Sequence, residues 1–337
     1  MQPVRTAIVG LGMMGSIHAR ILAASPAAEL VVACDTDPSA AEQLPEGVDF
    51  TGDIDEALDR PGLEALVLAT PQTVHRVGDE AGLARGLSVL CEKPMAATLD
   101  DADAIVEAGS GPDAHLVIGH MYRFDPRYQA IARAVRGGEL GRPIQLSARG
   151  NVPDFEGHLL AHRTSLALEN LVHSLDLMQW MAGPIVRVYG EASSTDVMGP
   201  GVVDSIAVTV RFDGGAVGIL ATGWNMPSGL GYASEQFFSV MGSEGLAWVD
   251  ARDNGSGIVG PSGTSFPATI SYDDPHGVPY GVYRTEVEAF LRSVREREPW
   301  PVSLVEARSA MAVAVAIDAA IESGGPVNVP TEAGADH

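Results

Sequence analysis

Short apolar runs alternate with amphipathic segments over the first 120 residues of the chain. The apolar runs predict strands at Val4–Val9, Glu29–Cys34, Glu64–Ala69, Ser88–Cys91 and His115–Ile118. Helical periodicity lies between them, at Met14–Ala24, Thr73–Arg85 and Leu99–Ala108. Continuous apolar strands separated by helices are typical of a parallel sheet covered on both faces. Residues 1–120 are therefore expected to form a doubly wound α/β domain.

The pattern changes after residue 120. Helices are expected at Pro126–Arg136 and Leu166–Met181, a strand near Ile144–Arg149 with a loop after it, and further strands at Val203–Phe212, Ala216–Thr222 and Glu235–Met241. In the first of these three strands, apolar residues occupy every second position, from Ile206 to Phe212. Such alternation predicts an antiparallel sheet with one face covered by helices. The opposite face is more polar, which suits either pairing with a second copy of the chain or contact with water.

Two helices are expected near the end of the chain. An apolar stripe at i, i+3, i+4 and i+7 marks the first, formed by Val287, Phe290, Leu291 and Val294. Ser303 and Glu306 have the spacing of a capping box that opens the second helix, which ends near Gly324. The domains expected are thus 1–120, a second α/β domain over 121–330, and a flexible tail over 331–337.

Charge and composition exclude several classes of function. Lys and Arg number 21 against 44 Asp and Glu, a net charge of −23, whereas nucleic acids and anionic membranes need a basic surface. The two cysteines, Cys34 and Cys91, lie far apart in apolar runs, which favours a reducing, cytoplasmic location. The sequence contains no run of eighteen apolar residues, so it predicts no membrane span. We therefore expect small-molecule partners.

A glycine-rich motif follows the first predicted strand directly. It reads Gly10-Leu11-Gly12-Met13-Met14-Gly15 and opens a predicted helix, with Asp35 at the end of the second strand, 20 positions after the last glycine. Such glycines let a pyrophosphate approach the helix N-terminus, and such an acid accepts from ribose hydroxyls. The alternative is an ordinary glycine-rich turn. Because Thr36 and its neighbours include no Arg or Lys to pair with a 2′-phosphate, the sequence favours NAD over NADP.

Lys93 is the only lysine in the chain. It follows the predicted strand Ser88–Cys91 and precedes Pro94. Ligands of open α/β sheets bind beyond the carboxyl ends of the strands, so this position suits the nicotinamide end of a dinucleotide. The alternative is that one lysine remains by chance in a sequence that uses Arg in place of Lys.

Four motifs together resemble those of the Gfo/Idh/MocA oxidoreductase family. They are the glycine motif, Ala69-Thr70-Pro71, Glu92-Lys93-Pro94, and Gly119-His120-Met121-Tyr122-Arg123-Phe124. The resemblance implies a Rossmann domain followed by an α/β domain with a large, mostly antiparallel sheet. It further implies NAD(P)-dependent oxidation of a hydroxyl, or reduction of the carbonyl, of a sugar or inositol-like cyclitol. Lys93 would bind the reacting oxygen, with Thr70, Pro71 and Glu92 beside the cofactor.

The family's second motif is Asp, then His four residues later, then Asp three further on. This chain has Glu169, His173 and Asp176, so glutamate replaces the first aspartate. At 100° per residue these three and Trp180 fall within about 60° of one another on a helix. A solvated face or an i,i+4 pair would explain that stripe equally. Together with Lys93, however, it suggests His173 as general base, Lys93 as the group that stabilises an alkoxide, and Glu169 as the residue that orients His173.

Further polar residues are candidates for substrate binding: Tyr122, Arg123 and Asn151, in addition to Lys93 and His173. His158 and His162 have a spacing that could hold zinc on a helix, but a zinc site needs at least three ligands, and no metal is expected. The sequence thus predicts an NAD-dependent dehydrogenase acting as a homodimer or homotetramer through its C-terminal sheet. An NAD-dependent glycosidase and a non-catalytic NAD-binding regulator remain alternatives.

Overall fold

The computed structural model describes residues 2–227, 234–252, 258–260, 263–265, 271–273 and 277–330. The chain divides into two compact units, the first made of Met1–Phe124 with Ile270–Arg308, the second of Asp125–Thr269 with Ser309–His337. The first boundary lies close to the predicted residue 120. The second unit is not continuous in sequence, unlike the expected range 121–330, because Ile270–Arg308 belongs to the first compact unit. The predicted tail, 331–337, lies outside the described residues.

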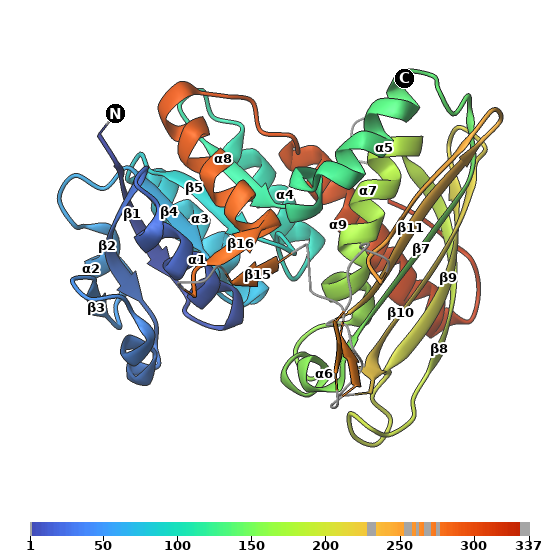
Figure 1. The fold of residues 1–337 in the computed structure, drawn as a ribbon, viewed down its shortest axis with the longest axis horizontal. Coiled ribbons are helices and arrows are strands. Elements are labelled where there is room, and N and C mark those ends of the chain that lie inside the picture. Colours follow the sequence, from blue (N-terminus) through green and yellow to red (C-terminus); the bar gives the residue numbers. More distant parts are fainter. Residues whose placement is uncertain are drawn as a thin grey trace. The chain divides into compact units, whose positions relative to one another are not determined.

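The first unit contains a six-stranded sheet in the order β3-β2-β1-β4-β5-β6, with every neighbouring pair parallel. Its strands are β1 (Val4–Val9), β2 (Ala28–Cys34), β3 (Asp49–Thr51), β4 (Ala65–Leu68), β5 (Ser88–Glu92) and β6 (Leu116–Gly119). The helices are α1 (Met13–Ala24), α2 (Ile54–Leu58), α3 (His75–Ala84), α4 (Leu99–Gly109) and α8 (Val282–Glu296), with 3-10 turns η1 (Pro38–Gln43), η2 (Gln72–Val74) and η3 (Met121–Phe124). The doubly wound parallel sheet is confirmed (Figure 1).

Helix α8 joins the first unit because its apolar stripe completes that unit's core. Val287, Phe290 and Leu291 are at most 1 % exposed and pack in one cluster with Val4 and Ile8 of β1. The stripe in the sequence predicts burial of the helix but does not identify the surface against which it packs. The strands β15 (Ser271–Asp273) and β16 (Pro279–Gly281) precede α8 as an antiparallel pair.

The second unit is built on a seven-stranded sheet in the order β12-β11-β7-β10-β9-β8-β17, antiparallel except where β10 runs parallel to β7. Its strands are β7 (Pro143–Pro153), β8 (Ile185–Ser193), β9 (Ser205–Phe212), β10 (Val217–Met226), β11 (Glu235–Gly242), β12 (Leu246–Asp250) and β17 (Val327–Asn328). A short pair, β13 (Ile258–Gly260) and β14 (Gly263–Ser265), lies apart from this sheet. The helical segments are α5 (Pro126–Arg136), α6 (Asp154–Leu160), the π-helical turn η4 (Ala167–Leu171), α7 (Val172–Ala182) and α9 (Leu304–Ser323), the last of which belongs to this unit from Ser309 on.

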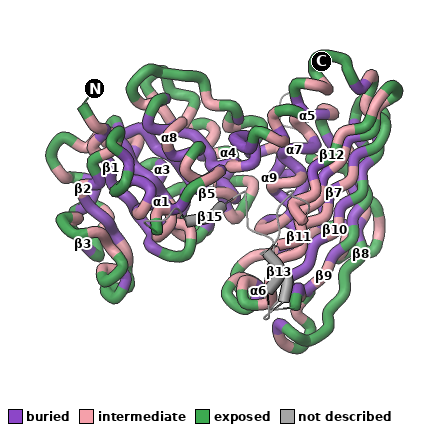
Figure 2. The backbone as a smooth tube through the Cα atoms, in the orientation of Figure 1, coloured by how far each residue is buried: buried purple, intermediate pink, exposed green. Residues whose placement is uncertain are grey.

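The two faces of this second sheet differ, as the alternation in β9 predicts. Ile206, Val208, Val210 and Phe212 are 1–4 % exposed on the side that α5 and α7 cover (Figure 1). Their neighbours Ala207, Thr209 and Arg211 are exposed, so buried and exposed positions alternate along the strand (Figure 2). We call the uncovered side the open face of the second sheet.

Three predicted elements of the second unit need correction. The strand near Ile144–Arg149 continues to Pro153, and the loop expected after it contains α6. The predicted long helix Leu166–Met181 is helical throughout, but residues Ala167–Leu171 form a π-helical turn directly before α7. The capping box at Ser303 is confirmed, since its Oγ accepts from the backbone N–H of Glu306 at 3.1 Å and its own N–H donates to the Glu306 carboxylate at 2.8 Å.

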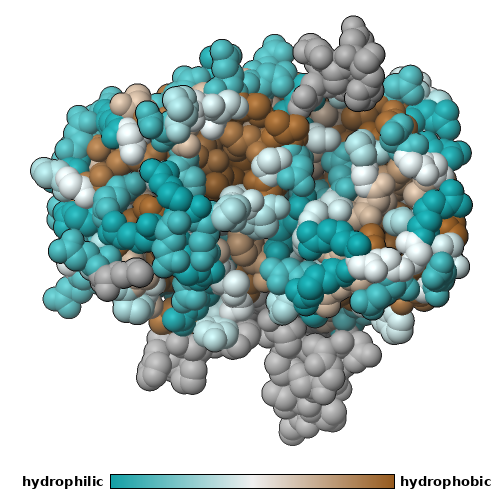
Figure 3. Space-filling model, turned by 90° about the horizontal axis from the view of Figure 1, so that it is seen from above, coloured by the Kyte–Doolittle hydropathy of each residue, from teal (hydrophilic) through white to brown (hydrophobic). Residues whose placement is uncertain are grey.

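The polar residues are distributed as expected for a chain with a net charge of −23, mostly on the surface. Hydrophilic side chains cover much of the face shown in Figure 3, with apolar residues between them. Among the described residues, few acidic side chains are buried: Asp79, Glu92, Asp125, Asp176, Asp204 and Glu286. Two of these, Glu92 and Glu286, lie at the carboxyl end of β5 and on α8.

Candidate active site

The glycine motif forms the turn between β1 and α1, and each glycine has a different reason to be there. Gly10 has φ of +89°, and a Cβ on it would lie 2.5 Å from the carbonyl oxygen of Ala69. A Cβ on Gly15 would lie 1.9 Å from the carbonyl oxygen of Gly10. A Cβ on Gly12 would meet nothing within 4 Å, and Gly12 is exposed at the N-terminus of α1. Two glycines thus serve packing, while Gly12 leaves open space where a pyrophosphate can approach the backbone.

Asp35, at the end of β2, is tied to this glycine turn. Its Oδ2 accepts from the backbone N–H of Leu11 at 2.6 Å, and its Oδ1 accepts from the N–H of Asp37 at 2.9 Å. The surroundings are acidic: burial, followed by the charges of Asp35, Asp53 and Glu56, raises the pKa of Cys34 to about 11. A dinucleotide with a 2′-phosphate would meet these carboxylates. Carboxylate oxygens that accept hydrogen bonds therefore fit the ribose hydroxyls of NAD.

Lys93 follows β5 at the carboxyl edge of the parallel sheet, half-buried and joined to Pro94 by a cis peptide bond. His75, 1 % exposed, links this turn to the preceding one: its Nε2 lies 2.8 Å from the carbonyl oxygen of Thr70, and its Nδ1 lies 3.0 Å from that of Pro94. Burial lowers the pKa of His75, and the contacts with carbonyls and the charge of Glu92 oppose that shift only in part. His75 thus connects the two motifs predicted to lie at the nicotinamide.

The sequence pattern does not single out His75. Its only signal is its place just after Thr70-Pro71 at the start of a helix, and a buried histidine there is also compatible with ordinary packing. The Oγ1 of Thr70 is buried without a hydrogen-bond partner among the described residues, and Thr36 is exposed beyond Asp35. Contacts of Thr36, Thr70 and Pro71 with a cofactor stay predictions.

Glu92 faces away from solvent. Its Oε1 lies 2.6 Å from Nε2 of His18 on α1, and its Oε2 accepts from the backbone N–H of Lys93 at 3.1 Å. Desolvation would raise the pKa of Glu92, but the hydrogen bond from His18 and the charges of His18 and Lys93 outweigh it and hold the pKa below its usual value. Glu92 therefore supports the turn at Lys93 from the buried side, and its predicted contact with the cofactor remains untested.

Two of the predicted substrate residues lie in η3 and are buried. Arg123 is 2 % exposed and donates from Nη1 to the carbonyl oxygen of Pro301 at 3.1 Å and from Nη2 to Glu306 at 3.2 Å. These bonds attach η3 to the segment before α9 and to the first turn of α9. Tyr122 is 7 % exposed in the same turn. The structure therefore gives Arg123 a packing role, and substrate contacts of both residues stay predictions.

In the second unit, Glu169 lies in the π-helical turn η4, and His173 and Asp176 lie on α7. The backbone N–H of Val172 bonds to the carbonyl of Ala167, five residues back, so the uniform 100° spacing assumed for Glu169 does not hold there. None of the polar stripe is exposed: Glu169, His173 and Trp180 are half-buried and Asp176 is 2 % exposed. This favours a built polar site over a solvated face, and π turns occur frequently at functional sites.

Specific hydrogen bonds attach the π turn to the rest of the second unit. Asn170 donates from Nδ2 to Oγ1 of Thr222 at 3.1 Å and accepts from Nε1 of Trp224 at 3.3 Å, both on β10. On the other side, Ser165 accepts from the N–H of Leu168 at 3.1 Å and donates to Asp318 of α9 at 2.6 Å. These bonds fix the segment that carries Glu169.

Asn151, the remaining predicted substrate residue, lies on β7. Alternation along β7 places Leu146 and Ala148 on the helix-covered side and Asn151 on the open face, where its Nδ2 donates to Glu235 at 2.6 Å. Substrate contact of Asn151 stays a prediction. The sequence pattern predicts this strand only as far as Arg149, so it does not show on which face of β7 Asn151 lies.

His158 and His162 are both exposed, the first within α6. That helix packs onto β10 through Gly157, where a Cβ would lie 2.6 Å from Cβ of Trp224. Neither histidine belongs to a group with metal-binding geometry. In the described part of the chain such a group is found at His18, Glu92 and Glu286 of the first unit.

Comparison with known proteins agrees with both units. The profile described as "Oxidoreductase family, NAD-binding Rossmann fold" of the GFO/IDH/MocA group matches residues 4–120, and the "GFO/IDH/MocA C-terminal domain" matches residues 128–247. Together the two matches cover most of the chain.

Relatives and solved structures are similar over nearly the full length. The chain is 26 % identical over 339 aligned positions to scyllo-inositol 2-dehydrogenase (NAD(+)) of Bacillus subtilis (strain 168), covering 97 % of this chain and 96 % of the relative. It is 24 % identical to myo-inositol 2-dehydrogenase of Thermotoga maritima, covering 95 % and 96 %. The fold matches that of scyllo-inositol dehydrogenase from Lactobacillus casei, solved with NAD(H) and scyllo-inositol, with a TM-score of 0.85, 21 % identity and coverage of 98 % and 100 %.

Among the described helices, none is long and apolar enough to cross a membrane.

Proposed function

Because the chain belongs to the Gfo/Idh/MocA oxidoreductase family, with an NAD-binding Rossmann domain at its N-terminus, we propose that it transfers a hydride between NAD and a hydroxyl-bearing carbon of a cyclitol or closely related sugar. The observation that carries this proposal is the position of Lys93, the only lysine. It lies at the carboxyl end of β5, in the same sheet edge as the glycine turn after β1. The similarity to inositol dehydrogenases supports a cyclitol as substrate.

Within this proposal, the residues of the chain supply placement, charge and proton transfer. NAD, when bound, supplies the hydride acceptor at its nicotinamide. His173 takes the proton of the substrate hydroxyl at an imidazole nitrogen, since the unperturbed pKa of histidine suits general-base catalysis near neutral pH. Lys93 stabilises the negative charge that develops on the same oxygen. Glu169, one methylene longer than the aspartate of the family motif, orients His173.

The cofactor residues act through backbone and carboxylate groups. The open space at Gly12 and the N-terminus of α1 accept the pyrophosphate, and Asp35 binds the adenosine ribose. His75 holds the turns after β4 and β5 in fixed register through the carbonyls of Thr70 and Pro94. The nicotinamide site would thus be formed before the substrate binds.

A panel experiment tests the proposal. The purified chain is incubated with NAD and, separately, with myo-inositol, scyllo-inositol, other inositol isomers and common aldoses, and NADH is followed by its absorbance. Formation of NADH with at least one inositol at catalytic rates supports the proposal. NAD binding without NADH on any substrate, in either reaction direction, would instead indicate a regulator, and release of an aglycone without net NADH would indicate a glycosidase.

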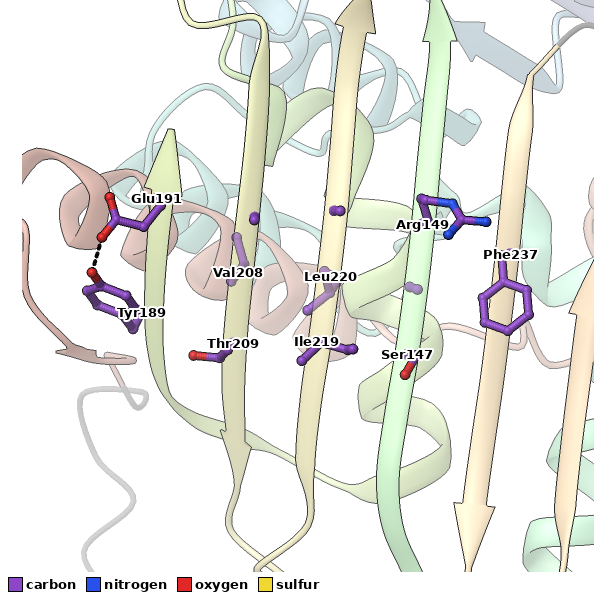
Figure 4. A pocket seen from close by; sticks show the side chains of 12 residues that line it. Ser147, Arg149, Tyr189, Glu191, Val208, Thr209, Ile219, Leu220 and Phe237 are labelled. Carbon is purple, nitrogen blue, oxygen red and sulfur yellow. Dashed lines mark hydrogen bonds between the residues drawn. The ribbon is translucent and has the colours of Figure 1, made fainter. Parts of the chain in front are cut away.

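We further propose that the chain forms a homodimer or homotetramer through the open face of the second sheet. A shallow groove runs across β8, β9, β10, β7 and β11 there, lined by side chains that include Tyr189, Thr209, Ile219 and Phe237 (Figure 4). Ile219 is 50 % exposed, and Trp248 of β12, on the same face, is 63 % exposed. Apolar side chains of this size, exposed together on one sheet, favour association.

We also propose a cytoplasmic location. Both cysteines, Cys34 and Cys91, are free and buried, which suits a reducing compartment. Fractionation of the producing cells, followed by immunodetection of the chain, tests this proposal directly.

A further inference from the structure

Three titratable side chains from distant parts of the sequence meet below Lys93 in the first unit. His18 of α1 is 0 %, Glu92 of β5 is 7 % and Glu286 of α8 is 1 % exposed. One ring nitrogen or carboxylate oxygen from each lies within 4.8 Å of the others. We call these residues the buried triad. A buried charge without compensation is strongly disfavoured, so the protonation states of the two carboxyl groups and the imidazole matter for the stability of this cluster.

The hydrogen bonds of Glu92 identify it as the charged member. Its two oxygens face two N–H groups, Nε2 of His18 at 2.6 Å and the backbone N–H of Lys93 at 3.1 Å. A carboxylate that accepts from donors on both oxygens is stabilised in its ionised form. The cation of Lys93, the next residue, adds a favourable charge.

Glu286 has the opposite surroundings. Its Oε1 is buried without a hydrogen-bond partner among the described residues. Its carboxyl group lies over the end of β6, 3.7 Å from where a Cβ on Gly119 would be, and Gly119 is the register partner of Glu92. Desolvation and the adjacent charge of Glu92 raise the pKa of Glu286 well above its usual value. Two buried carboxylates this close cannot both be ionised at low energy.

A metal ion would be the alternative use of such a group, but the geometry disfavours it. Two ligands of one zinc ion, each about 2.1 Å from the metal at a tetrahedral angle, lie about 3.4 Å apart. The His18 nitrogen and the Glu92 oxygen are only 2.6 Å apart, the distance of a charge-assisted hydrogen bond. The contact is therefore a shared proton and not a shared metal.

We propose that His18 and Glu286 are positioning residues for Lys93, with Glu286 acting as a neutral carboxylic acid beside the charged Glu92. In this arrangement, His18 holds the Glu92 carboxylate by its hydrogen bond, and Glu286 lies beside that carboxylate as an uncharged neighbour. Glu92 in turn holds the backbone of Lys93 at the end of β5. Of the two carboxyl groups of the buried triad, only that of Glu92 is then charged, next to the single lysine. The kinetic part of this inference rests on the proposed function, whereas its structural part does not.

The protonation state is tested first by infrared spectroscopy of the whole chain. The difference spectrum between wild type and Glu286→Gln should contain the C=O stretch of a protonated carboxylic acid, present in the wild type at pH 7. Glu288→Gln is the matched control, because Glu288 lies two residues on in α8 and pairs with Arg284 at 2.7 Å, so it should remove only a carboxylate band. A carboxylate band lost in Glu286→Gln would overturn the proposal, as would near-stoichiometric metal in the purified protein by elemental analysis.

The positioning role is tested at Lys93 without reference to activity. Reductive methylation with ¹³C-formaldehyde labels one lysine side chain, so that a single lysine dimethylamine resonance reports its surroundings, separate from that of the α-amino group. Glu286→Leu should shift this resonance, Glu286→Gln should restore it, and Glu288→Gln should leave it unmoved. An unchanged resonance in a folded Glu286→Leu variant would overturn the role. If Glu286→Leu fails to fold, His18→Gln serves in its place.

Kinetics then connects the buried triad to turnover. Glu286→Leu should lower kcat about 10- to 100-fold with little change in the Kd for NAD, because a small displacement of Lys93 affects the reacting oxygen more than the cofactor. The amide of Glu286→Gln should recover most of the loss. A loss in Glu286→Gln equal to that in Glu286→Leu would contradict a neutral acid. Absence of dehydrogenase activity in the wild type would instead count against the proposed function, while the resonance and infrared results would still decide the structural part.

Discussion

The two sheets of this chain use their strands in different ways. The parallel sheet of the first unit is buried on both faces, so its chemistry is confined to the carboxyl edge, where the glycine turn, Asp35 and Lys93 follow β1, β2 and β5. The mostly antiparallel sheet of the second unit is covered on one face only. Its helix side carries η4 and α7, and its other side is an open face. The functional residues of the first sheet thus lie at an edge, whereas the second sheet presents a whole face.

The difference teaches what must be known to locate a site. At a parallel edge, the end of each strand suffices, because all carboxyl ends meet there. On a half-covered sheet the register matters as well, since a shift of one residue moves a side chain to the other face. Asn151 illustrates the second case, because its position in β7 places it on the open face beside Glu235.

The largest expected effect concerns the edge. Lys93→Met should reduce kcat/KM about 10³-fold, because the developing alkoxide loses its cation, while the Kd for NAD changes little. NADH absorbance gives the rate and calorimetry gives the affinity for NAD. Arg76→Met is the control, since Arg76 is exposed on α3 in ion pairs with Glu80 and Asp101. Turnover within a few-fold of wild type would remove Lys93 from the mechanism.

A pair of neighbouring substitutions tests the two faces of the second sheet. Leu220→Glu places a charge on the covered face, where Leu220 is 2 % exposed, and should destabilise the fold by about 4 kcal/mol or more. Ile219→Glu changes the 50 % exposed residue next to it and should leave the melting temperature nearly unchanged while it weakens association. Calorimetry and light scattering after size-exclusion chromatography measure the two effects. If Ile219→Glu keeps the oligomer of the wild type intact, the open face is not the interface.

Two glycines of the first unit provide a similar contrast within one turn. Gly15→Ala forces a Cβ to within 1.9 Å of the Gly10 carbonyl oxygen, and should lower the free energy of unfolding by about 3 kcal/mol. Gly12→Ala meets no protein atom within 4 Å, so the fold should keep its stability while the affinity for NAD falls about tenfold. Denaturant unfolding and NAD titration separate these outcomes. Equal loss of stability in both variants would contradict the packing assigned to Gly15.

The smallest expected effect concerns a buried acid, Asp79, on a helix that covers the parallel sheet. Asp79 of α3 is 0 % exposed, neither carboxylate oxygen has a hydrogen-bond partner among the described residues, and desolvation raises its pKa to about 8, which contact with Cys91 only partly offsets. Between about pH 4 and pH 8 the unfolded chain releases this proton and the folded chain keeps it. The contribution of Asp79 to the free energy of unfolding should therefore decrease as the pH rises through that window.

Asp79→Asn removes the titration and nearly preserves the shape of the side chain. It should raise the free energy of unfolding at pH 8 relative to wild type by about 2 kcal/mol, and by less at pH 5. Thermal unfolding of both proteins across this pH range measures the difference. Asp113→Asn, in the exposed segment before β6, is the control for the loss of one charge. A wild-type advantage that grows with pH would have the wrong sign and would contradict the raised pKa.

Much of the fold follows from local patterns. Val4–Val9 and Pro126–Arg136 are predicted with the observed bounds, because an uninterrupted apolar run marks one and an Asp-Pro helix start marks the other. β8 escapes prediction because Gly190 and polar residues interrupt its alternation. The π turn at Glu169 has no signal in hydrophobic periodicity. The assignment of α8 to the first unit depends on what its stripe packs against, which no local pattern contains.

The candidate site divides in the same way. Motifs with local geometry, such as the glycine turn and the strand end at Lys93, can be read from the sequence. His18 and Glu286 cannot, because they meet Glu92 across 74 and 194 positions of the chain. Their types also suggest other roles: a histidine in an amphipathic helix and an acid beside an apolar stripe both look like surface residues. The contacts that support Lys93 therefore emerge only from the folded structure.

The placement of α8 has a consequence for biosynthesis. Since Val287, Phe290 and Leu291 complete the core around β1, the first unit lacks part of its interior until the ribosome has passed residue 291. Residues 125–269, which belong to the second unit, leave the ribosome before that moment. Domains commonly fold in the order of their synthesis. In this chain, the first unit is the first to be synthesised, but its core is complete only after α8 has been translated. Most of the second unit is translated before α8.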